Sequence, residues 1–266
     1  MEFEELHGVW TANLSVEEAT ITVIAGESRC LLVDTGFSPD EGTRIRAAIQ
    51  QITDLPLEVV VLTHGHWDHA FGLGAFSDLD TIGHENLVTD IQCRENTIWA
   101  KKQRIPLLSI PTPETLIGVI AVRDLGNLSV EIAHFGHAHT SSDLIIAVPD
   151  RNVVIVGDLV EAGPPQFDET TSIHGWVAAL DCLHSILKPD MTVICGHGTP
   201  LTADHVTKFR AGLAAIWDQS EWAFNQGMSH AGAVKEFEWP WDTDTARKGV
   251  ARAYEELKAR PQQVSL

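Results

Sequence analysis

The chain has 266 residues, of which 44% are hydrophobic and 21% are charged. These are ordinary values for a globular protein, and they exclude a disordered or collagen-like chain. Eighteen Lys and Arg against 37 Asp and Glu give a net charge of −19, which opposes binding to nucleic acids and to anionic membrane surfaces. No apolar run approaches the roughly 18 residues of a membrane-spanning helix, so we expect none.

The cellular compartment is predicted from the amino-terminal segment and the cysteines. Residues 1–10 are acidic and lack the apolar stretch after a basic one that marks a signal peptide, so we expect no such peptide. The four cysteines are scattered without a CxxC spacing, which indicates a reducing compartment. We therefore expect a cytoplasmic protein. The sequence carries no signal for an oligomeric state.

The first hundred residues predict short strands and two helices. The apolar runs 20–25 and 30–33 form a hairpin around a Gly-Glu-Ser turn. Residues 40–52 predict a helix, because their apolar side chains recur on one helical face. The run 57–62 predicts an apolar strand that is buried on both faces. Residues 85–104 predict a single helix, since a proline follows them.

The remainder of the chain continues this mixture and then becomes helical. Four further strands are predicted over residues 117–122, 128–135, 144–148 and 153–156. An amphipathic helix over 176–187 and a strand over 191–195 follow. Two long helices, 202–226 and 242–260, complete the chain. This order of elements predicts two β-sheets with helices outside them.

Four potential metal ligands follow the apolar strand 57–62. Residues 63–72 read Thr-His-Gly-His-Trp-Asp-His-Ala-Phe-Gly. Because residues two apart on an extended segment point to the same side, His64 and His66 can share a metal. Asp68 and His69 lie just beyond them and can face a second position. The helical HExxH arrangement of many zinc proteases is absent from this segment.

Three more candidates stand at later strand ends, each with glycine nearby. His139 lies between two predicted strands, Asp158 follows the strand 153–156, and His197 follows the last predicted strand. Five histidines and two aspartates without a thiolate suit zinc, with iron or manganese as alternatives. Seven ligands exceed one tetrahedral ion. They therefore predict two ions that share a bridging carboxylate and a bridging water.

These motifs, with Asp34 in Val-Asp-Thr-Gly before them, resemble the metallo-β-lactamase superfamily. The five motifs of that family occur in order over residues 20–200. The resemblance implies an α/β fold, an αββα sandwich of two mixed β-sheets with helices on the outer faces. It also implies a single domain over residues 1–266, with a core of about residues 8–200 and a helical C-terminal extension of about residues 201–266.

The resemblance further implies a role for each residue. One metal is held by His64, His66 and His139, the other by Asp68, His69 and His197, and Asp158 bridges them. The family places the third-motif ligand directly before threonine, which selects His139 over His137. Asp34 resembles the acid that supports the ligands in this family. A turn before Gly36, made by the Asp34 side chain, explains this residue nearly as well.

The function implied is that of a zinc-dependent hydrolase. A hydroxide that bridges two metals is a nucleophile at neutral pH, because metal binding lowers the pKa of water to about 7. Asp68 is expected to orient it and to accept its proton. Asp158 stands where true β-lactamases usually have cysteine or serine, which argues against that activity. We predict a dinuclear hydrolase of a small-molecule ester, lactone, thioester or amide. A mononuclear iron oxygenase of persulfides and a phosphodiesterase of this superfamily are the alternatives.

The sequence also suggests which residues line the substrate pocket. Trp67 lies within the metal motif and is expected at the pocket rim, and the loop 161–169 should line the pocket because it follows Asp158. Trp239 and Trp241 either join this rim or pack the C-terminal helices onto the body. We favour packing for these two residues.

Overall fold

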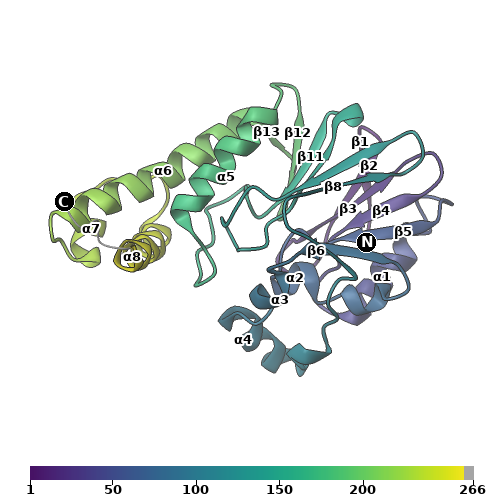
Figure 1. Cartoon of the computed structure of the whole chain (residues 1–266), viewed down its shortest axis with the longest axis horizontal. Coiled ribbons are helices and arrows are strands. Elements are labelled where there is room, and N and C mark those ends of the chain that lie inside the picture. The colour runs from purple at the N-terminus through teal and green to yellow at the C-terminus, as the bar shows by residue number, and fades with distance from the viewer. Residues whose placement is uncertain (261–266) are drawn as a thin grey trace.

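A computed structural model describes residues 1–260. Two β-sheets lie face to face, and helices cover their outer surfaces (Figure 1). Each sheet contains antiparallel and parallel pairs of strands. This arrangement confirms the expected αββα sandwich of two mixed β-sheets.

The first sheet has seven strands that neighbour one another in chain order. They are β1 (Glu4–Leu6), β2 (Val9–Asn13), β3 (Thr20–Ala25), β4 (Cys30–Val33), β5 (Leu57–Val61), β6 (Asp80–His84) and β7 (Thr115–Ile117). The second sheet contains β13 (Leu201–Thr202), β12 (Thr192–Cys195), β11 (Val153–Gly157), β10 (Ile145–Val148), β9 (Ser129–Ala133) and β8 (Ile120–Asp124), in this order. Valine, leucine and isoleucine side chains from both sheets form the core between them.

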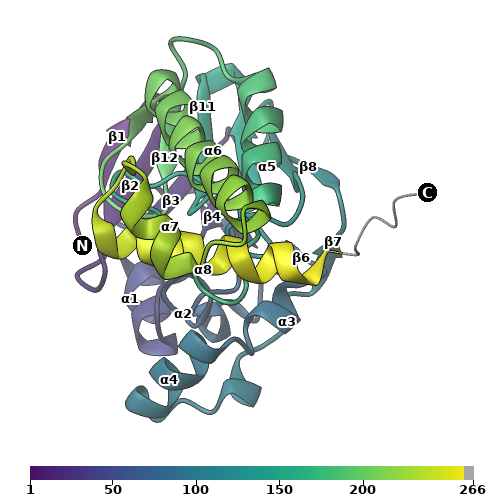
Figure 2. The same ribbon diagram turned by 90° about the vertical axis from the view of Figure 1, so that its left-hand side faces the viewer.

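Helices pack on the outer face of each sheet. The first sheet is covered by α1 (Pro39–Ile49), α2 (Trp67–Ala70), α3 (Leu87–Asp90) and α4 (Arg94–Gln103). The second sheet is covered by α5 (Ile173–Ile186) and α6 (Ala203–Asn225), and α7 (His230–Glu236) and α8 (Thr243–Ala259) pack on α6. Short 3-10 helices lie at Leu73–Phe76, Leu107–Ser109 and Pro149–Arg151. Figure 2 shows α5 and α6 side by side, with α8 crossing them.

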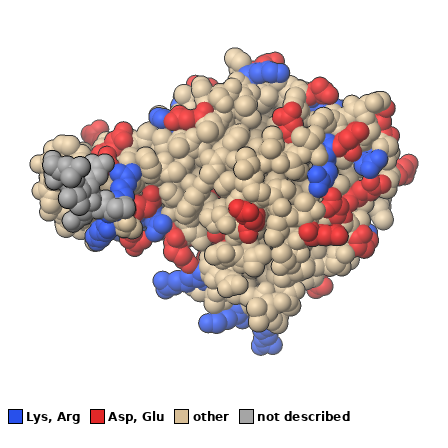
Figure 3. All heavy atoms as spheres, in the orientation of Figure 1, with Lys and Arg blue, Asp and Glu red and all other residues tan. Residues whose placement is uncertain are grey.

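The two long C-terminal helices begin where their capping residues predict. Thr202 accepts a hydrogen bond from the backbone of His205, and Asp242 accepts from Asp244 and Thr245. Such caps satisfy amide groups that have no partner within the helix. No helix in residues 1–260 is both long enough and apolar enough to cross a membrane. On the face drawn in Figure 3, acidic side chains are dispersed over the sandwich, as expected of charges that interact with solvent.

Three predicted elements differ from the structure. The single helix expected over 85–104 is wrong, because the chain breaks at Cys93 into α3 and α4. The break lets Asn96 donate hydrogen bonds to the backbone of Gly65, Asp90 and Ile91, which joins α4 to the metal motif. The run 117–122 was expected as one strand, yet it is divided between the two sheets, since β7 ends at Ile117 and β8 begins three residues later.

The strand β5 also departs from its prediction, because it is only partly buried. Leu57 is half-buried, and Glu58 is exposed and forms an ion pair with Arg29 at 3.0 Å. Only Val59–Val61 are buried on both faces, next to the metal motif. Four elements, β1, β2, β6 and α7, were not predicted, because polar residues interrupt their apolar ones.

Candidate metal centre

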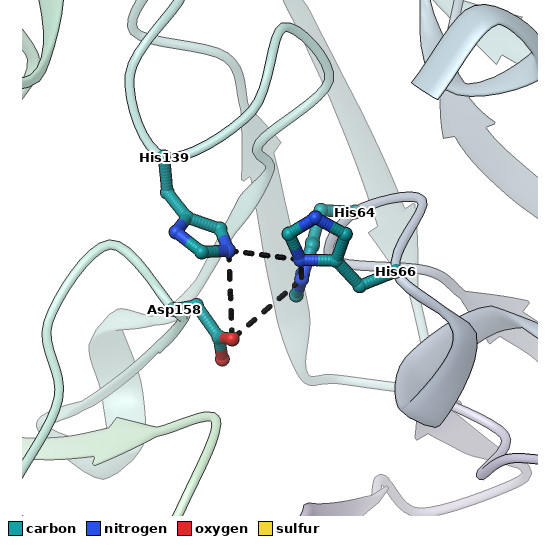
Figure 4. Close-up of side chains that lie close together, drawn as sticks. All are labelled: His64, His66, His139 and Asp158. Atoms are coloured by element: carbon teal, nitrogen blue, oxygen red, sulfur yellow. Dashed lines mark hydrogen bonds and ion pairs between the residues drawn. The ribbon is translucent and has the colours of Figure 1, made fainter. Parts of the chain in front are cut away.

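The seven predicted ligands converge at the carboxyl ends of strands from both sheets. His64 and His66 lie directly after β5, and Asp68 and His69 are on α2. The other three follow β9, β11 and β12, at His139, Asp158 and His197. In Figure 4 the side chains of His64, His66, His139 and Asp158 point toward one another. The structure therefore brings all of them into one place, while their role as ligands stays a prediction.

The first group consists of three imidazoles and one carboxylate. His66 Nδ1 lies 3.1 Å from His64 Nε2 and 3.0 Å from His139 Nε2. Asp158 Oδ2 lies 3.7 Å from His64 Nε2 and 3.6 Å from His139 Nε2. Tetrahedral ligands at zinc-bond lengths of about 2.0–2.1 Å are about 3.3–3.4 Å apart. These four atoms therefore have nearly the separations of ligands around a single ion.

The second group lies on the other side of Asp158. His69 Nε2 and His197 Nε2 are 3.3 Å apart, and Asp68 Oδ2 is 3.7 Å from the first and 3.4 Å from the second. The Asp158 carboxylate reaches this group as well, with Oδ1 3.5 Å from His69 and Oδ2 3.3 Å from His197. Asp158 thus contacts both groups, which is the position of a bridging carboxylate.

Hydrogen bonds on the outer nitrogens of the rings determine which atoms face the centre. His69 Nδ1 donates to Asp34 Oδ2 at 2.8 Å, and His197 Nδ1 donates to the Glu17 carbonyl at 2.7 Å. When each ring keeps only this Nδ1 proton, as a metal ligand must, its Nε2 atom presents a lone pair to the centre. Within residues 1–260, the buried Asp158 Oδ1 has no hydrogen-bond partner. A metal ion among these converging nitrogen and oxygen atoms would satisfy them, so the residues fit a metal.

The pKa values of the four histidines below show which rings hold an extra proton when no metal is bound. Burial lowers the pKa of His64 well below its usual value and, with His66 nearby, that of His139 to about 3. Burial also opposes the charged forms of His69 and His197, but Asp158 and Asp68 outweigh it and raise their pKa values to about 9 and about 11. A metal that binds the second group must therefore displace protons.

Asp34 supports predicted ligands of both groups. Its carboxylate accepts hydrogen bonds from the backbone nitrogen of Thr63, the hydroxyl of Thr63 and His69 Nδ1, each at 2.8 Å. Thr63 Oγ1 in turn accepts from His64 Nδ1 at 3.0 Å. Asp34 has a φ of 65°, a strained conformation for a residue with a side chain. The structure favours the supporting role over that of a turn residue.

A cavity of about 540 Å³ opens onto both groups. The loop 161–169 lines it, as predicted, and so does Trp67, which is 6% exposed and stacks on Trp99 at 3.7 Å between ring centroids. Trp241 packs edge-on against Phe209, and Trp239 donates a hydrogen bond to the Val234 carbonyl. The prediction that these two tryptophans pack the C-terminal helices is therefore confirmed.

Several histidines that are not among the seven predicted ligands contact groups outside the candidate metal centre. His137 bonds to the carbonyl of Thr170, and His84 stacks on His134 at 3.8 Å between ring centroids. His174 lies against Trp217. The choice of His139 over His137 thus agrees with the geometry.

Sequence reasoning missed three contributions to the site. Asp168 Oδ2 lies 3.2 Å from His66 Nε2, and Lys248 of α8 reaches the cavity. Glu17 contributes a backbone carbonyl from a turn in which Glu17 and Glu18 have φ of 55° and 54°. The expected pocket loop could have indicated Asp168, whereas no pattern indicates a backbone carbonyl or a lysine so distant in sequence.

Known proteins are similar to this chain over different lengths. A linear primary-alkylsulfatase from Pseudomonas sp. is 20% identical in an alignment that covers 79% of this chain. The alignment covers 48% of the relative, so the chain spans about half the length of that curated protein. A solved metallo-beta-lactamase from Pontibacter korlensis superposes with a TM-score of 0.66 at 18% identity, covering 80% of this chain and 98% of that one.

A second solved structure is similar over nearly the whole chain. It is a stereoselective inverting sec-alkylsulfatase from Pseudomonas sp., with a TM-score of 0.77 at 15% identity, covering 99% of this chain and 51% of that one. At such identities the likeness shows the fold alone. The family model of the metallo-beta-lactamase superfamily matches residues 15–197, which include all five motifs. The chain therefore belongs to the metallo-beta-lactamase superfamily.

Proposed function

We propose that this protein is a dinuclear metal-dependent hydrolase of a small-molecule ester, lactone, thioester or amide. The observation that carries the proposal is the position of Asp158 between two groups of ligand atoms, 3.3–3.7 Å from histidine nitrogens of both. Each group offers three protein ligands besides the shared Asp158. Catalytic zinc can expand to five-coordination, so each ion could still accept water or substrate.

The ions would be held as the motifs imply. His64, His66 and His139 would bind one ion, and Asp68, His69 and His197 the other, with zinc best suited and iron or manganese as alternatives. Two bound ions would supply a hydroxide nucleophile at neutral pH and polarise the scissile group. Asp68 lines the cavity as well as the second group, so we assign it the proton that the nucleophile loses. The Asp34 carboxylate keeps the rings oriented.

The cavity suits a small substrate. Its volume of about 540 Å³ lies within the usual range of ligand pockets, about 300–1,000 Å³. Trp67 and Phe167 provide apolar walls, whereas Glu17, Glu18 and Glu95 make the lining acidic. An acidic lining disfavours polyanions, which agrees with the expectation that nucleic acid is no substrate.

Hydrolysis of a sulfate ester is the second candidate. It is favoured by the likeness to a sec-alkylsulfatase over 99% of this chain, a span that takes in the C-terminal helices. The two hydrolytic candidates use the same site and differ in the ester that enters it. A mononuclear oxygenase is less favoured, because it leaves Asp68, His69 and His197 without a metal.

Metal analysis combined with a substrate panel tests the proposal. We expect about two zinc ions per chain and turnover of a carboxylic ester, lactone, thioester or amide that a chelator abolishes and zinc restores. His139→Ala should lower the metal content, whereas His137→Ala, two residues away and bonded to Thr170, is the matched control and should retain it. Turnover of alkyl sulfates alone would favour the second candidate. One iron per chain with oxygen uptake would contradict the hydrolase.

A further inference from the structure

His66 is held through both of its ring nitrogens. Nδ1 faces His64 and His139 at 3.1 and 3.0 Å, and Nε2 lies 3.2 Å from Asp168 Oδ2. If Nδ1 presents its lone pair to an ion, the neutral ring carries its proton on Nε2 and donates it to Asp168. A carboxylate that accepts from the outer nitrogen of a ligand histidine fixes the tautomer and the rotation of the ring.

The Asp168 carboxylate is itself fixed in place. Oδ1 accepts hydrogen bonds from the backbone nitrogen of Thr170 at 2.7 Å and from its hydroxyl at 2.6 Å. The Asp168 backbone nitrogen donates to Thr171 Oγ1 at 3.2 Å. These local bonds hold one carboxylate oxygen and leave Oδ2 for His66. The side chain is 14% exposed, so water competes little for this bond.

Asp168 belongs to the loop 161–169, which lines the substrate cavity after Asp158. The next residue, Glu169, accepts a hydrogen bond from the backbone nitrogen of Arg94 at the start of α4. Two successive acids of the loop thus contact the metal motif and the helix beside it. The loop that contacts the substrate is therefore joined to the ligand His66.

We infer that Asp168 is a positioning residue that presents His66 Nδ1 to the ion of the first group, and that it couples this ion to the substrate-lining loop. The inference deepens the proposed function and rests on it. The second group is positioned separately, because His69 is held by Asp34 and His197 by the Glu17 carbonyl. Loss of the Asp168 carboxylate should therefore weaken the binding of one ion and leave the binding of the other unchanged.

A competing arrangement would use the same atoms as ligands. His66, Cys93 and Asp168 offer ligand atoms within 4.8 Å of one another, which could hold a third ion. Cys93 Sγ already accepts a hydrogen bond from the backbone nitrogen of Asn96, as the cap of α4. An ion there would require His66 to bind metal through both nitrogens and lose its last ring proton. Positioning requires no such loss, and we favour it.

Titration of the metal-free full chain with Co²⁺, followed by visible absorption, tests the inference. Asp168→Ala should weaken one of two binding steps by about 10–100-fold and leave the other unchanged. Asp168→Asn should recover part of this loss, because the amide oxygen still accepts the hydrogen bond. Asp150→Ala is the control, because this exposed acid is not among the residues that line the cavity, and it should retain both affinities. Metal-free Asp168→Ala should melt somewhat below the wild type, because Thr170 loses its hydrogen-bond acceptor, so the difference between the two binding steps carries the test.

Three outcomes would overturn the inference. Unchanged affinities in Asp168→Ala would remove the positioning role. An equal loss at both steps with a lowered melting temperature would make Asp168 a structural residue of the loop. A thiolate-to-cobalt charge-transfer band that Cys93→Ser abolishes would make Asp168 a ligand of a further ion. If the wild type binds a single ion, the dinuclear proposal fails. Weaker binding of that ion in Asp168→Ala would still support the positioning role of Asp168.

Discussion

Replacing Gly196 with alanine should disable the metal centre without unfolding the protein. A Cβ atom added at Gly196 would lie 1.8 Å from Asp158 Oδ1 and 3.0 Å from the Asp158 Cγ. Side-chain carbons do not approach another heavy atom within 3.0 Å, so the carboxylate oxygen must move by at least 1.2 Å (3.0 − 1.8). Because Asp158 contacts both groups of ligands, this movement displaces the carboxylate that they share.

The expected effect is large for metal binding and small for folding. Zinc–oxygen bonds are about 2.0–2.2 Å long, so a displacement of this size breaks the bond. Misplacing a catalytic group by about 1 Å can lower the rate about 10²-fold. Overpacking typically costs about 1–3 kcal/mol. In the metal-free protein the Asp158 side chain can rotate away, so the free energy of unfolding should change by less.

Three measurements check this prediction. They are the zinc content by elemental analysis, kcat/KM on a substrate from the panel, and the melting temperature of the chelated protein. Gly163→Ala is the control, since Gly163 also lines the cavity and an added Cβ meets nothing within 4 Å. Two tightly bound ions and normal turnover in Gly196→Ala would refute the placement of Asp158 as the shared ligand.

The remaining predictions concern charge at the site. Asp158→Ala should weaken the binding of both ions, because the two dications lose the carboxylate between them. A zinc titration in which only one equivalent is lost would exclude a bridging role. Asp68→Asn should lower turnover about 10²–10⁴-fold with little change in the melting temperature, and near-normal turnover would leave Asp68 only a positional role. Zinc affinity should rise from about pH 6 to pH 8, because binding displaces protons from His69 and His197, whose pKa values are raised to about 9 and about 11. A constant affinity would contradict this exchange.

The places of several predicted ligands could be anticipated, because His64, Asp158 and His197 closely follow strands with a clear apolar pattern. Val59–Val61 and Val153–Val156 are buried in the sheets, so the residues after them are fixed where the strands end. The short glycine-containing motifs that follow these strands then restrict where the side chains of His64, Asp158 and His197 can lie. The fold class followed from the same alternation of short strands and helices.

Other features depend on contacts between distant segments, which no local pattern records. The end of β7 and the start of β8 look like one strand, because both are apolar and only the packing separates the sheets. The break at Cys93 follows from the hydrogen bonds of Asn96 to three backbone carbonyls. The contacts of Asp168 with His66 and of the Glu17 carbonyl with His197 span 102 and 180 residues.

X-ray absorption of the zinc-loaded protein tests the central claim most directly, because it measures the surroundings of the ions themselves. We predict zinc neighbours of nitrogen and oxygen only, at about 2.0–2.2 Å, together with zinc–zinc scattering at about 3.5–4 Å. The metal–metal scattering should disappear in Asp158→Ala. Spectra with sulfur among the neighbours, or without metal–metal scattering at two zinc ions per chain, would contradict a pair of ions bridged by Asp158.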